Sequence, residues 1–340
     1  QWLWIHTEVI LRMAFLKKVF MNKNDYLQLK EKVKRLKNSD LIALWWVIRA
    51  SLITITWLCL LLSNHNILNI VGIPLGVAVV FNWVSILHDC GHGHFFSKSW
   101  MNTIVGLTAS IFSLLPFEQW RTIHNLHHRW TGYFDKDPTA SGPNKTMIKE
   151  NQRKVVDFAW KYWVPIFVIS FYVRSFWNPF FTLQFSPSIK KKAFQLFCLL
   201  FMIVPYIILY HFFGMNFLIP FLLSTFFTLF ISDPFLLSQH TYFERKYYNE
   251  EDSHPTIPPR KQDEYTRELI FPPFISNFVF MNFNYHVLHH FFPSLPAYHL
   301  PELIKWTPQA TNRQNWTTWV IEAKKIQGHK LLMSHGVIAP

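Results

Sequence analysis

Four long apolar runs dominate the hydrophobic pattern of the chain: residues 41–62, 67–87, 193–213 and 215–231. A helix rises about 1.5 Å per residue, so about 20 apolar residues cross a hydrocarbon core about 30 Å thick. Residues 63–66 join the first two runs, and Gly214 joins the last two. The pattern therefore predicts an all-α membrane protein whose four transmembrane helices form two hairpins.

Two further apolar stretches, residues 101–117 and 158–177, are predicted to be helices at the membrane interface. The second contains Lys161 and Arg174, and a single crossing there would carry the lysines at 190–192 to the outer side. The alternative is that both stretches cross as a pair. That arrangement would place the first two histidine clusters described below on opposite sides of the membrane.

Composition also indicates a membrane protein and excludes an ordinary soluble enzyme. Of the 340 residues, 50% are hydrophobic and 16% are charged, whereas roughly 25% are charged in a soluble domain. The three cysteines show no CxxC or Cys/His spacing. Neither a disulfide framework nor a structural zinc site is therefore expected.

The distribution of positive charge predicts the orientation of the chain. The net charge is +13, residues 1–40 are rich in lysine, and neither hairpin tip contains Lys or Arg. Because positive segments stay cytoplasmic, we expect both termini and the long middle section on that side. We divide the chain into a basic N-terminal segment (1–40), a membrane catalytic domain (41–305) and a C-terminal tail (306–340). The chain begins with Gln, and Met13 or Met21 is a candidate native start.

Histidine is over-represented and clustered. The 17 histidines include one HxxxH and two HxxHH clusters, each just beyond an apolar segment on the predicted cytoplasmic side. Positions i, i+3 and i+4 share a helix face, so each cluster presents its imidazoles in one direction. One more histidine follows the fourth span at the same depth. The nine candidate ligands are His88, His92, His124, His127, His128, His240, His286, His289 and His290.

Nine imidazoles at one depth predict a metal centre. Neutral imidazole is the commonest metal ligand, and an ion takes about four to six ligands, so nine suit two ions. The Irving–Williams order favours copper or zinc, but a catalytic zinc typically uses only about three protein ligands. Two nitrogen-bound ions beside a membrane therefore suggest redox chemistry on oxygen.

Three acidic residues are candidates to orient the imidazoles through their second ring nitrogen: Asp89, Asp135 and Asp137. Each has an alternative role. Asp89 fits a charge at a helix end, and Asp135 and Asp137 fit a turn before a proline.

These clusters resemble the three histidine boxes of the integral-membrane fatty acid desaturase family. The stretches "HDCGHGHFFSKSWMNTIVG", "PFEQWRTIHNLHHRWTG" and "NYHVLHHFFPSLPAYHLPEL" stand in the family's order, and the resemblance covers about residues 40–305. It implies four spans below a cytoplasmic helical cap and a non-haem di-iron centre held by the nine histidines. It also implies that the reduced irons activate O2 and that hydrogen is abstracted from an unactivated methylene, leaving a double bond.

Details of the boxes narrow what the resemblance implies. The first box encloses Asp89, Cys90 and Gly91 and is similar to that of acyl-lipid desaturases, and no haem-binding HPGG motif is present. A lipid-linked or thioester acyl substrate is therefore implied, with electrons from a separate ferredoxin or cytochrome b5 that a basic surface would attract. Trp120 and Arg121 either line the substrate mouth or anchor the chain at the interface.

Two alternative functions are weighed against the same histidine pattern. A hydroxylase or ketolase of the same superfamily, acting on a carotenoid, lipid or alkane, would need the same histidines. A metal transporter would place ligands near the bilayer midplane between repeats, whereas these histidines gather at one end of the spans. We therefore expect a membrane fatty acyl desaturase.

Overall fold

The computed structural model describes residues 21–63, 65–140, 149–241, 243, 245–249, 256–307 and 312–332, so the candidate start Met13 lies outside the described residues. Four described helices are long and apolar enough to cross a membrane. They are α3 (Asp40–Leu61), α4 (Asn66–His92), α10 (Ile189–Phe213) and α11 (Met215–His240). The helical class is confirmed, and each of the four predicted spans corresponds to a helix long and apolar enough to cross.

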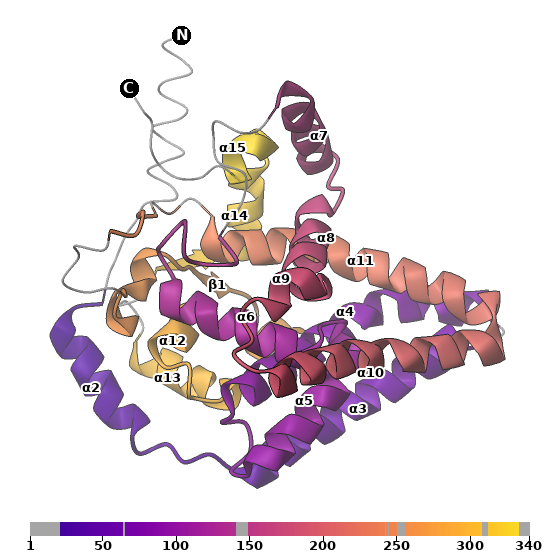
Figure 1. The fold of residues 1–340 in the computed structure, drawn as a ribbon, viewed down its shortest axis with the longest axis horizontal. Coiled ribbons are helices and arrows are strands. Elements are labelled where there is room, and N and C mark those ends of the chain that lie inside the picture. Colours follow the sequence, from indigo (N-terminus) through magenta and orange to yellow (C-terminus); the bar gives the residue numbers. More distant parts are fainter. Residues whose placement is uncertain are drawn as a thin grey trace.

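The four long helices run together toward one end of the molecule (Figure 1). At the other end lie α6 (Phe117–Trp130), α12 (His286–Phe291) and α13 (Leu300–Trp306), together with strand β1 (Glu268–Ile270), and we call this end the cap. β1 pairs in parallel with β2 (Arg313–Asn315), which lies beyond the predicted limit of the catalytic domain. Shorter helices elsewhere include α2 (Lys23–Val33), α9 (Pro179–Leu183), η2 (Pro259–Glu264), η3 (Ile275–Val279), η4 (Ala297–His299), α14 (Trp316–Ala323) and α15 (Gly328–Leu332).

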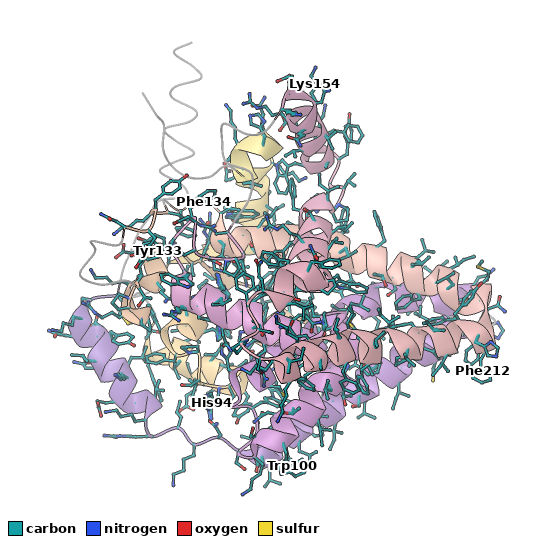
Figure 2. All side chains as sticks on the ribbon, viewed as in Figure 1. His94, Trp100, Tyr133, Phe134, Lys154 and Phe212 are labelled. Carbon is teal, nitrogen blue, oxygen red and sulfur yellow. The ribbon has the colours of Figure 1, made fainter. Side chains whose placement is uncertain are left out.

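The outer faces of the long helices carry exposed apolar side chains. Phe212, labelled at the hairpin tip in Figure 2, is 74% exposed, and Ile55, Leu200 and Leu222 are also exposed. Water-soluble proteins rarely expose so continuous an apolar surface. The surface is the one that helices surrounded by lipid require.

α4 is the central helix, packed against α3, α5 (Ser99–Ser113) and α11. Gly76 permits the close approach of α11, because a Cβ atom there would lie 2.1 Å from Oγ of Ser224. Ser224 instead accepts a hydrogen bond from Trp57 at 3.1 Å and donates to the carbonyl of Ile73 at 2.9 Å. Three spans are thus joined by one hydroxyl within the bundle.

α4 and α11 extend beyond the predicted spans. Prediction from hydropathy ended the second span at residue 87 and the fourth at residue 231, but the helices continue to His92 and His240. The apolar runs end where polar side chains enter the buried cap, and the helical hydrogen bonds continue through them. α4 ends only at Gly93, whose φ of +76° is readily adopted by glycine.

The first predicted interfacial stretch, residues 101–117, is not one helix. α5 ends before Leu114, which has a φ of +58°, and α6 then leaves at an angle of 96°. The apolar pattern cannot reveal this bend, because both sides of it are helical.

The second predicted interfacial stretch, residues 158–177, is also divided. α7 (Glu150–Lys161) is separated from α8 (Ile166–Tyr172) by Trp163, whose φ is +60°, and η1 (Val173–Trp177) continues α8. The two parts meet at 113°. If each bent pair were a broken span the number of crossings would rise from four to six. An interfacial placement stays a prediction.

Arg49, the one charged residue in the first apolar run, joins the spans to the cap side of the molecule. Its guanidinium donates to Oδ1 of Asn277 at 2.7 Å and to the Asn277 carbonyl at 3.0 Å. Asn82 of α4 donates to the carbonyls of Phe278 and Val279 at 2.9 and 3.0 Å. These polar contacts hold η3 against α3 and α4.

Candidate metal centre and cavity

The nine candidate histidines form two adjoining groups where α4, α6, α11 and α12 meet. Within each group, the ligating nitrogens all lie within 4.8 Å of one another. The rings of His128 and His290, one from each group, are 4.4 Å apart between centroids. The five-histidine group consists of His88, His92, His124, His128 and His289, and the four-histidine group consists of His127, His240, His286 and His290.

Helix geometry explains why two of the clusters contribute to both groups. In α6, His124 and His128 are about one turn apart and enter the five-histidine group, whereas His127 points around the helix to the other group. In α12, His286 and His290 enter the four-histidine group and His289 enters the five-histidine group. An HxxHH sequence on a helix can therefore serve two ions.

The ring nitrogens converge as ligands of an ion do. Nε2 of His289 lies 2.8 Å from Nε2 of His88 and 2.7 Å from Nε2 of His128. Nε2 of His286 lies 2.6 Å from Nε2 of His240. Nitrogens bound about 2.0–2.1 Å from one ion lie roughly 3 Å apart, so the two spacings are similar.

A buried nitrogen without a partner is a further sign that the groups fit a metal. His92 belongs to the five-histidine group, and its Nε2 is buried without a hydrogen bond to any described residue. Buried polar atoms are normally satisfied. A bound ion would satisfy this nitrogen.

Burial keeps the imidazoles of α12 neutral. It lowers the pKa of His286 to about 3, with a smaller contribution from His127. Burial, followed by the neighbouring imidazoles, also holds the pKa values of His289 and His290 well below the ordinary value. Neutral imidazole is the metal-binding form, and an all-nitrogen set suits iron, zinc, copper or nickel.

Two of the three acidic candidates lie against histidine Nδ1 atoms. Oδ1 of Asp89 accepts from Nδ1 of His88 at 2.9 Å, and its Oδ2 accepts from the backbone N–H of Ala297 at 2.7 Å. Oδ2 of Asp137 accepts from Nδ1 of His127 at 2.8 Å. Such contacts fix the ring orientation and leave Nε2 free for a metal.

Asp137 is held as a charged acceptor. Burial alone would raise its pKa, but His127 and the hydrogen bonds from His127 and Thr139 hold the pKa of this carboxyl below its ordinary value. Asp135 lies elsewhere, because its Oδ1 accepts from the backbone N–H of Tyr248 at 2.9 Å. This carboxylate therefore ties its turn to a distant segment of the chain instead of orienting an imidazole.

Gln262 and Arg267 support the site, although the sequence patterns did not single them out. Oε1 of Gln262 accepts from Nδ1 of His290 at 2.8 Å, and its Nε2 donates to the carbonyl of His128 at 2.9 Å. Arg267 is fully buried and donates to the carbonyl of Ser238 at 2.5 Å, close to the end of α11. Gln262 therefore bridges the two histidine groups.

Glu268 holds the first turn of α12. Its Oε2 accepts from the backbone N–H groups of Val287 and Leu288 at 3.1 and 3.3 Å, and burial raises its pKa to about 7. The only signal for this residue in the sequence is its position, with Arg267, directly before the apolar run at 269–274. Charged residues are rarely buried without partners.

A cavity of about 290 Å³ opens beside the histidines, and we call it the site cavity. His127, His240 and His286 of the four-histidine group line it, but only His124 of the five-histidine group does so. Its other walls come largely from α8, η1 and α11. They are mostly apolar, with Phe167, Phe171, Phe176, Leu236 and Phe283 beside the polar Arg174, Asp233 and Arg245.

Trp120 lines the site cavity and is only 5% exposed, so it does not anchor the chain at a lipid interface. Its ring stacks on His124 with 4.2 Å between centroids. Arg121, the other residue considered for the substrate mouth, pairs with Glu118 on the same helix.

Comparison with known proteins adds an independent observation. The family model described as fatty acid desaturase matches residues 66–321. The sn-1 oleoyl-lipid 12-desaturase of Picosynechococcus sp. is 25% identical over 254 residues, which are 70% of this chain and 67% of that protein.

Two other relatives match over shorter segments. A Delta(12) fatty acid desaturase of Caenorhabditis elegans is 36% identical over 101 residues, 30% of this chain and 25% of that protein. An omega-3 fatty acid desaturase of the endoplasmic reticulum of Vigna radiata is 31% identical over 112 residues, 31% of this chain and 29% of that protein. These two matches each span less than a third of the relative's length.

Proposed function

The chain belongs to the fatty acid desaturase family, and we propose that it introduces a double bond into a lipid-linked or thioester acyl chain, using O2 and a di-iron centre. The observation that carries this proposal is the arrangement of nine histidines in two adjoining groups beside a largely apolar cavity. Two groups offer one site for each ion, and the cavity offers a place for a methylene next to them.

We assign one iron to each histidine group. Bound there, the pair supplies the oxidising chemistry that removes two hydrogens from an unactivated acyl chain. The protein keeps the imidazoles of α12 neutral by burial. It orients three of the nine rings through Asp89, Asp137 and Gln262. Phe167, Phe171 and Phe283 form apolar walls that would exclude water from the reacting chain.

Electrons are proposed to come from a separate ferredoxin or cytochrome b5 type of protein. One relative, from Nostoc sp., is named as an sn-1 acyl-lipid omega-3 desaturase (ferredoxin). The net charge of +13 would favour encounter with an acidic donor. We also propose that the cap faces the cytoplasm, because the basic segments flank the spans on that side.

Expression with a suitable electron donor, followed by mass spectrometry of the host lipids, tests the reaction. Desaturation removes two hydrogens from an acyl chain. A gain of one oxygen instead would overturn the proposal in favour of a hydroxylase or ketolase. The lengths of the acyl fragments formed by ozonolysis would then give the position of the double bond.

Metal analysis of the purified protein tests the site. We expect about two irons per chain, and His92→Ala should lower the iron content and abolish desaturation. His94→Ala is the matched control, because His94 is exposed and lies two residues further along, outside both groups. Equal iron content and activity in the two variants would contradict the ligand assignment.

A further inference from the structure

A second hollow, of about 630 Å³, lies between α4 and α11 below η3 and the start of α14, and we call it the lateral groove. Its lining is almost wholly apolar. Residues that define it are Val71, Ala78, Phe227, Ile231, Phe274 and Trp316. None of the residues lining the lateral groove also lines the site cavity.

The lateral groove opens on the lipid-facing surface. Val71 is 53% exposed and Phe274 is 67% exposed, and both belong to its lining. Along α4, Ala78 stands ten residues before His88, which corresponds to about 15 Å. The groove therefore extends from hydrocarbon depth toward the base of the cap.

A row of aromatic rings leads from the lateral groove to the site cavity. Phe280 lines the groove and stacks on the fully buried Phe235 with 4.5 Å between ring centroids. Phe235 lies 6.2 Å from Phe283, which lines the site cavity and lies 5.2 Å from the ring of His88. The path from bilayer to histidines thus passes one short row of side chains.

Trp316 lines the cap end of the groove. Its Nε1 is buried, and no described residue accepts a hydrogen bond from it. Tryptophan is well suited to the boundary between acyl chains and polar head groups, where its N–H meets ester carbonyls. The groove therefore offers apolar walls for a chain, with a tryptophan at the end where the ester that carries the chain would lie.

We propose that the lateral groove binds the acyl chain of a bilayer glycerolipid and is the lateral entrance for the substrate chain. This inference rests on the proposed desaturase function and narrows it to lipid-linked substrates. A bilayer lipid is the occupant because the groove is continuous with the membrane-facing surface of α4 and α11. Passage to the histidines requires the side chains of Phe235 and Phe280 to move aside.

Narrowing the groove tests the proposal. Val71→Trp places a large ring in the groove, and Ile70→Trp is its matched control, because Ile70 is 65% exposed on the same helix but does not line the groove. Thr317→Trp narrows the other end of the groove at an exposed position. Each variant is placed in lipid nanodiscs that contain a phosphatidylcholine with a photoreactive acyl chain.

Two readouts are compared: crosslinking of the photoreactive chain to residues 271–280, and desaturation of bilayer lipid. We expect Val71→Trp and Thr317→Trp to lower both readouts at least fivefold, while Ile70→Trp stays within twofold of the unmodified protein and all variants keep their iron.

Loss of crosslinking without loss of desaturation would show a structural lipid only and overturn the proposed entrance for the substrate chain. Unchanged crosslinking in both groove variants would overturn the binding site. If the unmodified protein forms no double bond, the proposed function fails, while crosslinking still reports on lipid in the groove.

Discussion

The two histidine groups differ in ligand number and in access to the site cavity. The five-histidine group has more nitrogens but contributes only His124 to the cavity wall, whereas three of the four histidines in the other group line it. An ion with fewer protein ligands keeps more room for a further ligand. We therefore expect the reacting methylene to lie nearer the four-histidine group.

The groups also differ in how their rings are fixed. In the four-histidine group, Nδ1 atoms bind Asp137, Gln262 and the carbonyl of Tyr265. In the five-histidine group, His88 binds Asp89, and packing against neighbouring rings such as Trp120 orients His124. Hydrogen bonds therefore fix more of the rings in the four-histidine group, which faces the site cavity, than in the five-histidine group.

The largest expected effect is loss of a ligand from either group. His289→Ala and His290→Ala should each lower desaturation at least about 100-fold, because both ions are needed. Metal analysis would test the assignment of one ion to each group, since each variant should lose about one of the two irons. A variant that kept both irons, or a single substitution that emptied both sites, would contradict the assignment of one ion to each histidine group.

The next effect concerns the support of His127. Asp137→Asn should lower iron affinity and desaturation about 10- to 100-fold, as expected when an orienting carboxylate is lost. Asp135→Asn is the matched control, because its carboxylate binds the backbone of Tyr248 instead of an imidazole. Equal losses in the two variants, measured by iron titration, would mean that the turn as a whole and not the His127 contact is required.

A smaller effect is expected for Gln262. Gln262→Leu removes the contacts to Nδ1 of His290 and to the carbonyl of His128. A net hydrogen bond contributes about 1 kcal/mol, so we expect roughly a fivefold loss of iron affinity for the four-histidine group. Gln262→Glu keeps an acceptor for His290 and should lose less, and a result in the opposite order would contradict this assignment.

The smallest effect concerns Glu268, which holds α12 for both groups alike. Its pKa is raised from 4.5 to about 7 by burial, so between these values the folded state keeps a proton that the unfolded state has released. Stability contributed by this proton is complete below pH 4.5 and is lost as the pH rises to about 7.

We therefore expect the unmodified protein to lose about 1 kcal/mol of stability between pH 6 and 7 relative to Glu268→Gln, which does not titrate. Thermal unfolding of both proteins in the same detergent would measure the difference. Parallel curves would show that Glu268 is not protonated in the folded state.

The sequence predicted the features that repeat along the chain. Apolar runs placed four spans, and helical spacing placed eight of the nine histidines that the structure brings together. The ninth, His240, was predicted from its depth after the fourth span and from the family resemblance. The division of His127 from His128 between two groups was not predictable, because it depends on where α11 and α12 approach α6. The bends at Leu114 and Trp163 also escaped prediction, because positive φ values carry no hydropathy signal.

The supporting roles of Gln262 and Glu268 could not be predicted from the sequence for a similar reason. Each acts through a contact with residues distant in the sequence, and nothing in the neighbourhood of either residue repeats. Asp89 and Asp137 were accessible to prediction because they lie close in sequence to the histidines that they contact. Local patterns thus identified the candidate ligands, whereas tertiary packing determined most of their supports.

The length of α4 has a consequence for how the membrane acts on the site. Its 27 residues extend about 40 Å, against a hydrocarbon core of about 30 Å, and His88 and His92 stand on its protruding end. The tilt of a long transmembrane helix follows the thickness of the bilayer. The end of α4 that protrudes from the hydrocarbon core carries two of the imidazoles, so a change of tilt would move them. Because unsaturated chains make a bilayer thinner and more fluid, accumulation of the proposed product would change the force on the helix that helps to form it.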